Sequence, residues 1–179
     1  MRAASVPVSR ESLPSTALLA TYAAGGAYTD CYRTALPREV ALAEFVEAFY
    51  TGRVFKLERL LLRLFARRPS TDAEARAVAR GDTARFAAWD VEERMPDQLL
   101  MCDMAGRTRS WFMVAPTPGA VQGTLLHFGS AVVPVRDRAT GQARMGWPFA
   151  ALLGFHRLYS RVLLAAARDR LRRALPSRP

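Results

Sequence analysis

The chain contains very little lysine and no long apolar run. Lys56 is its only lysine among 26 basic residues, and the excess of arginine gives a formal net charge of +10 at pH 7. No run of about 18 apolar residues occurs, so the sequence predicts no membrane-spanning helix. With 179 residues, half of them hydrophobic, the chain has the length and composition of one globular domain, residues 1–179.

Cysteine and histidine are scarce as well. The two cysteines, Cys31 and Cys102, and the two histidines, His127 and His156, show no metal-ligand spacing. A glycine-rich phosphate loop and a Ser-His-Asp signature are also missing. We therefore expect no metal, no cofactor and two reduced thiols that are not bonded to each other, as is usual for a cytoplasmic protein. Prolines and polar residues interrupt the approach to the apolar segment 17–27, so no cleaved signal peptide is expected.

The first half of the chain predicts one strand followed by helices. Residues 1–14 are polar and broken by proline, which is typical of an extended N-terminal arm. Residues 28–34 alternate aromatic or thiol side chains with polar ones, and this alternation indicates a strand. We expect a helix that opens at Pro37, a second helix over residues 53–66, and a third that begins with a capping box at Thr71.

The second half predicts antiparallel strands and one long helix. Four segments are strand candidates: residues 85–94, 98–104, 107–115 and 121–135. Short turns such as Ala105–Gly106 join them, which favours antiparallel pairing. Residues 147–174 have one wide apolar face at helical spacing and predict a single helix that packs on a sheet. The predicted fold class is α+β, with two to three helices inserted after the first strand and an antiparallel sheet packed against the C-terminal helix.

Several short segments resemble one bacterial family. They are Leu13-Pro14-Ser15, Tyr28-Thr29-Asp30, Leu36-Pro37 and, in the closing helix, Phe155-His156-Arg157-Leu158-Tyr159-Ser160-Arg161. Over roughly residues 13–175 the chain resembles a family of uncharacterised bacterial proteins related to the START-like and polyketide-cyclase-like (SRPBCC) helix-grip superfamily. The resemblance implies a helix-grip fold and a hydrophobic cavity between the sheet and the C-terminal helix, which holds apolar ligands in relatives. It brings no catalytic residues.

His156 is the leading candidate for a functional residue. It lies in the apolar stripe of the closing helix, next to Tyr159 and Ser160. A titratable ring that faces a cavity can hydrogen-bond a ligand or act as a general acid or base. The alternative is a core histidine whose ring is bonded to a backbone carbonyl or to Tyr159.

Three strand residues are further candidates for the ligand-binding surface. Trp111 and Met113 share one face of a strand, where they either line a pocket or belong to the core. His127 lies in a strand that is apolar on both faces, so the sequence does not decide whether it faces His156.

These observations leave three functions open. The leading interpretation is a protein that binds an apolar or amphipathic small molecule between the sheet and the C-terminal helix. The second is a cyclase- or dehydratase-type enzyme that uses His156 as an acid or base. The third is a basic interaction protein that contacts nucleic acid or an anionic membrane through residues 52–82 and 168–179, each with four more basic than acidic residues. Nucleic acid is disfavoured because the basic helical faces of these segments carry no aromatic residues between their arginines.

Overall fold

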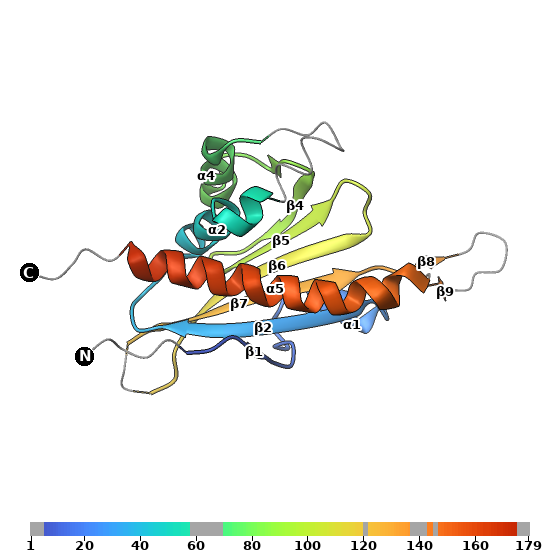
Figure 1. The fold of residues 1–179 in the computed structure, drawn as a ribbon, viewed down its shortest axis with the longest axis horizontal. Coiled ribbons are helices and arrows are strands. Elements are labelled where there is room, and N and C mark those ends of the chain that lie inside the picture. The colour runs from blue at the N-terminus through green and yellow to red at the C-terminus, as the bar shows by residue number, and fades with distance from the viewer. Residues whose placement is uncertain (1–5, 58–69, 120–121, 137–142, 145–146, 175–179) are drawn as a thin grey trace, which may run out of the picture.

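The computed structural model describes residues 6–57, 70–119, 122–136, 143–144 and 147–174. Within them the chain forms an α+β structure with a seven-stranded antiparallel sheet and a long C-terminal helix (Figure 1). In spatial order the strands are β1 (Ser9–Arg10), β2 (Tyr28–Leu36), β7 (Thr124–Val132), β6 (Thr108–Pro116), β5 (Gln98–Asp103), β4 (Trp89–Arg94) and β3 (Arg85–Phe86). A separate two-stranded sheet pairs β8 (Val135–Arg136) with β9 (Ala143–Arg144).

The predicted strands are present with changed bounds. The strand expected over residues 85–94 is divided into β3 and β4, because Ala87 between them has a φ of 53° that interrupts the extended backbone. The turn from β5 to β6 contains Gly106 with a φ of 68°, a left-handed conformation that glycine adopts without strain. The N-terminal arm contributes β1, which pairs with β2.

Four helices have complete bounds: α1 (Ala20–Ala24), α2 (Leu42–Tyr50), α4 (Asp72–Arg80) and α5 (Trp147–Arg173). The first of them was not predicted, and α2 begins later than Pro37. The hydroxyl of Thr124 explains the later start, since it accepts a hydrogen bond from the Val40 amide (2.9 Å) and donates to the Arg38 carbonyl (2.8 Å). These bonds tie the segment between β2 and α2 to β7.

The third predicted helix, α4, has the termini that its sequence indicates. Thr71 and Glu74 form the reciprocal hydrogen bonds of a capping box, and Gly81 ends the helix in the left-handed conformation. The guanidinium group of Arg94 donates to the carbonyl groups of Val78 and Ala79, where a cation stabilises the negative end of the helix dipole.

Part of the second predicted helix is described. Residues 53–57 are helical. The rest of the range 53–66, with Arg59 and Arg63, lies outside the described residues, as does Arg67.

The C-terminal helix is a single helix, as predicted. It lies lengthwise along β2 and contacts β7 and α2, so it covers the first long strand more than the strands of residues 85–116 (Figure 1). Among the described residues, no helix has both the length and the apolarity needed to cross a membrane.

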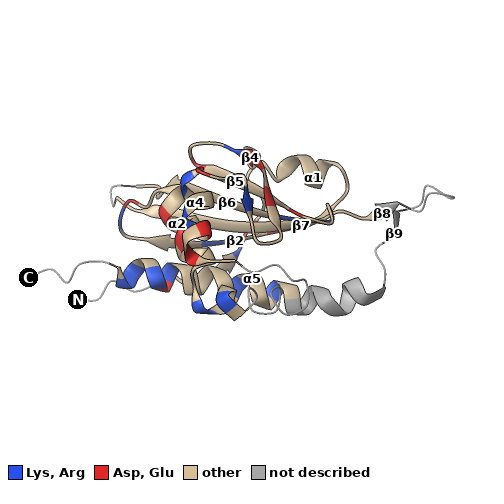
Figure 2. Ribbon diagram, turned by 90° about the horizontal axis from the view of Figure 1, so that it is seen from above, with Lys and Arg blue, Asp and Glu red and all other residues tan. Residues whose placement is uncertain are grey.

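Two apolar cores lie on opposite faces of the sheet. The larger core packs the sheet against α2, α4 and α5 and includes Phe112 and Leu164. The smaller core packs the sheet against the segment that leads into α1 and includes Leu19 and Trp111. Successive side chains of a strand point to opposite faces, which places neighbouring residues of β6 in different cores. Figure 2 shows α1 and α5 on opposite sides of the sheet.

Candidate functional site

A polar cluster interrupts the apolar contact between α5 and the sheet. It contains Tyr28 and Asp30 from β2, Ser130 from β7, and His156 and Arg157 from α5, and we call it the Asp30 cluster. The register of β2 and β7 places Asp30 directly opposite Ser130. Because residues on alternate strand positions share a face, these side chains are on the face that α5 covers.

Asp30 is the buried centre of the Asp30 cluster, with no exposed side-chain surface. Its Oδ1 accepts hydrogen bonds from the Ser130 amide (3.1 Å) and the Ser130 hydroxyl (2.6 Å). The Oγ atom of Ser130 is also 2.6 Å from Nε2 of His156, which is 3.6 Å from Oδ2 of Asp30. Since the serine proton is directed at Asp30, Oγ must accept from His156, so Nε2 of the imidazole carries a proton.

Tyr28 and Arg157 complete the Asp30 cluster on its outer side. The Tyr28 hydroxyl donates to Oδ2 of Asp30 (3.4 Å), and the Arg157 guanidinium donates to the Tyr28 oxygen from Nε (3.2 Å). This contact with Tyr28 raises the pKa of Arg157. The side chain of His156 remains 28% exposed, so the imidazole is accessible while Asp30 is not.

Tyr32 lies on the same face of β2, two residues beyond Asp30. It is 1% exposed, and its hydroxyl has no hydrogen-bond partner among the described residues. Burial, followed by the charge of Asp30, raises the pKa of Tyr32 to about 12, so the hydroxyl keeps its proton.

Three of the six predicted site residues lie on α5, which covers the face of the sheet that carries the Asp30 cluster. Tyr159 and Ser160 follow His156 on α5; Ser160 is buried, and Tyr159 packs against the larger core. Asp30 and Ser130 were not predicted as site residues, although both contact the predicted histidine.

Trp111, Met113 and His127 lie on the opposite face of the sheet. Trp111 is fully buried in the smaller core, Met113 packs against that core, and the His127 ring is 6.2 Å from the Trp111 ring. They do not line the space between α5 and the sheet, so of the two alternatives that the sequence left open the structure shows the core position. The sequence left the choice open because β7 is covered on both faces, so its sequence does not show which face carries the histidine.

His127 is buried and neutral near pH 7. Burial, followed by the charge of Arg33, lowers its pKa to about 4, and its Nδ1 has no hydrogen-bond partner among the described residues. Arg33 is opposite His127 in the register of β2 and β7 and forms an ion pair with Glu11 (3.0 Å).

The stability of the protein should therefore fall as the pH drops from about 6.5 to about 4. In this window the unfolded chain binds a proton that folded His127 does not bind, so acid favours unfolding by about 3 kcal/mol. Denaturant unfolding at about pH 7 and about pH 4.5 measures the change, and His127→Leu should remove most of it. The same pH dependence in the variant would contradict this assignment, because carboxylates titrate in both proteins.

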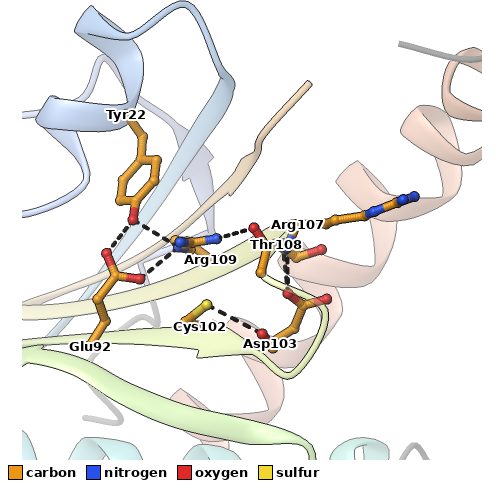
Figure 3. A network of polar contacts seen from close by, with 8 residues as sticks. Tyr22, Glu92, Cys102, Asp103, Arg107, Thr108 and Arg109 are labelled. Carbon is orange, nitrogen blue, oxygen red and sulfur yellow. Dashed lines mark hydrogen bonds and ion pairs between the residues drawn. The ribbon is translucent and has the colours of Figure 1, made fainter. Parts of the chain in front are cut away.

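A second polar network ties α1 to the sheet (Figure 3). The Tyr22 hydroxyl donates to Glu92, and Nε of Arg109 donates to both the Tyr22 oxygen (2.9 Å) and Oε2 of Glu92 (2.8 Å). The Arg109 guanidinium also lies 4.6 Å from the centre of the Tyr22 ring, a cation–π contact. These contacts join α1, β4 and β6. The polar side chains of Tyr22, Glu92 and Arg109 therefore have a structural role, which is to hold α1 on the sheet.

Both cysteines are free thiols on this second face. Burial raises the pKa of Cys31 to about 12 and also raises the pKa of Cys102, whose Sγ donates to the Asp103 carbonyl (3.2 Å; Figure 3). A raised pKa disfavours the thiolate, so neither cysteine is an activated nucleophile.

The described part of the chain contains no group of three or more His, Cys, Asp or Glu side chains that could hold a metal ion.

Comparison with known proteins gives no match to a family model, a curated protein or a solved structure.

Proposed function

We propose that this chain is a helix-grip protein that binds a small, mainly apolar molecule between α5 and the sheet. The order of its elements supports this fold: a long strand, helices, antiparallel strands and a closing helix, with β2 next to β7. The observation that carries the function is the accessible imidazole of His156, which a buried carboxylate orients through Ser130. Such a placement gives an apolar site one directed polar contact.

The hydrogen bonds define what His156 offers to a ligand. Nε2 donates to Ser130, so the other ring nitrogen, Nδ1, is an acceptor when the ring is neutral and a donor when it is protonated. A ligand hydroxyl or carbonyl group suits these two states. Asp30 and Ser130 are positioning residues, because they hold the ring and do not need to touch the ligand.

A nucleophilic role for Ser130 is not part of the proposal. Its side chain is 1% exposed, and its proton is directed at Asp30 and not at the histidine. The order of groups is therefore Asp-Ser-His, and a serine nucleophile requires its hydroxyl to face the histidine that removes the proton.

The second candidate function is acid–base catalysis at the same histidine. It is favoured by the 3.6 Å distance between Nε2 of His156 and Oδ2 of Asp30, because the buried carboxylate holds the imidazole in one orientation, and a general acid or base must be positioned in this way. A cyclase- or dehydratase-type reaction would use this proton on the bound molecule. Turnover of the ligand by the parent protein would separate catalysis from binding.

The test compares the two histidines, which lie on opposite faces of the sheet. Native mass spectrometry of the parent should detect a co-purifying small molecule, and the neutral dye Nile red should bind the emptied protein. His156→Phe should lose the small molecule and weaken dye binding about ten-fold, which corresponds to about 1.4 kcal/mol. His127→Leu is the control and should retain both.

Thermal unfolding of both variants separates binding from stability. If His156→Phe melts far below the parent while its folded fraction binds the dye equally well, His156 is a core residue and the proposed function is wrong.

A further inference from the structure

The outer face of α5 borders a groove that is separate from the Asp30 cluster. Its volume is about 440 Å³, and it is lined by Pro7, Val8, Leu158, Arg161, Val162, Ala165 and Arg168, which we call the α5 groove. One wall is the N-terminal arm and the other is a stripe of α5 residues at helical spacing. The carbonyl group of Val6 accepts from Thr34 (2.7 Å) and from Arg168 (2.7 Å), so the arm is fixed in place beside the helix.

The α5 groove exposes large apolar side chains to water. Leu158 is 62% exposed and Val162 is 41% exposed, and both line the groove. A single exposed leucine is ordinary, but two large apolar residues one helical turn apart in the same groove form a surface that a partner can cover.

The charge around the α5 groove is positive. No acidic residue lines it, and the exposed side chain of Arg161 forms no ion pair among the described residues. Arg168 is already engaged by Asp169 (2.8 Å) and by the Val6 carbonyl group, so Arg161 is the cation that the groove can offer. Further exposed arginines, Arg172 and Arg173, continue along the helix toward its C-terminus, and the blue segments of α5 in Figure 2 follow this course.

We propose that the α5 groove binds an acidic amphipathic segment of a partner protein. Apolar side chains of the partner would cover Leu158 and Val162, and a carboxylate would pair with Arg161. The helix-in-groove mode of peptide recognition uses this combination of an apolar groove and flanking charge. The arginines beyond the groove would speed association with an acidic partner through long-range attraction.

Two other occupants fit the observations less well. A second copy of this chain carries the same net charge of +10, so self-association at a basic face is opposed by repulsion. A lipid surface would gain little here, because only two large apolar side chains of the groove, Leu158 and Val162, are exposed and could enter it.

The experiment measures binding of a synthetic helical peptide that has leucine and glutamate on one face. The parent should bind it, and a peptide with serine in place of leucine should not bind. Leu158→Ser and Arg161→Glu should each weaken binding about ten-fold. Met104→Ser and Arg76→Glu are matched controls: Met104 is 59% exposed, Arg76 is an exposed arginine of α4, and both lie outside the groove. The controls should bind like the parent.

Three results would overturn the proposal. They are an absence of peptide binding to the parent, equal weakening by Arg76→Glu and Arg161→Glu, and stronger binding to phosphatidylglycerol vesicles that depends on the same two groove residues. The last result would assign the groove to an anionic membrane. Because the groove lies outside the Asp30 cluster, Nile red binding should be unchanged in all four variants, which keeps this test independent of the proposed function.

Discussion

Asp30→Ala should lower the free energy of unfolding by about 4 kcal/mol. The carboxylate accepts both the amide and the hydroxyl hydrogen bond of Ser130 in a site without exposed side-chain surface. Removing it leaves two buried donors unpaired, and each unpaired donor costs about 1–3 kcal/mol. Denaturant unfolding of the parent and the variant at neutral pH measures the difference.

Asp30→Asn is the matched control for this prediction. The asparagine oxygen can still accept from Ser130, so we expect a smaller loss of about 1–2 kcal/mol. Its NH2 group would then face the Nε2–H of His156, and the imidazole should shift its proton to Nδ1, which nitrogen NMR of the ring detects. A gain in stability in Asp30→Ala would instead show that the buried charge costs more than its hydrogen bonds contribute.

Phe112→Ala should have an effect of similar size, about 4 kcal/mol, because it opens a cavity in the larger core. Phe112 is fully buried, and its ring centre lies 4.8 Å from that of Phe49, 5.3 Å from that of Phe128 and 5.5 Å from that of Tyr50. These edge-on and tilted rings join α2 to the middle of the sheet, so the cavity cannot close without moving the helix. Denaturant unfolding measures the loss.

Phe112→Leu and Met104→Ala test whether the loss comes from the cavity. Leucine refills most of the volume and should cost about 1–2 kcal/mol. Met104 is 59% exposed at the β5–β6 turn, so its replacement should change stability by less than about 0.5 kcal/mol. A loss below about 1 kcal/mol in Phe112→Ala would contradict the packing described for this core.

The sequence predicted the elements whose buried face is single and whose ends carry a chemical signal. The closing helix has one apolar stripe over its length, and α4 has both Thr71 at its start and Gly81 at its end. The five-residue helix α1 has no signal at its start, since its N-terminal cap residue, Leu19, makes no side-chain hydrogen bond, and only glycine, Gly25, marks its end. Its position is determined by tertiary contacts, above all those of Tyr22 with Glu92 and Arg109.

The candidate site was predicted in part for a similar reason. Helical spacing placed His156 on the sheet-facing side of its helix, but its partners come from strands far away in sequence. Asp30 and Ser130 are 100 residues apart, and they meet only because β2 and β7 pair in one register. The sequence did contain one signal. Asp30 alternates with Tyr28 and Tyr32, so the three side chains share one face of the strand, and an exposed carboxylate is not expected on that face.

The two strands at the margins of the sheet have a consequence for solubility. β1 and β3 contain two residues each, so neither margin offers a long row of free backbone groups to another chain. At the β2 margin the arm forms hydrogen bonds with β2 beyond the residues of β1. The Glu11 amide donates to the Cys31 carbonyl group (3.0 Å), and the Thr34 hydroxyl donates to the Val6 carbonyl group (2.7 Å). Loss of the arm would expose the nine residues of β2 as a template for strand addition. We therefore expect the arm to reduce aggregation of the protein.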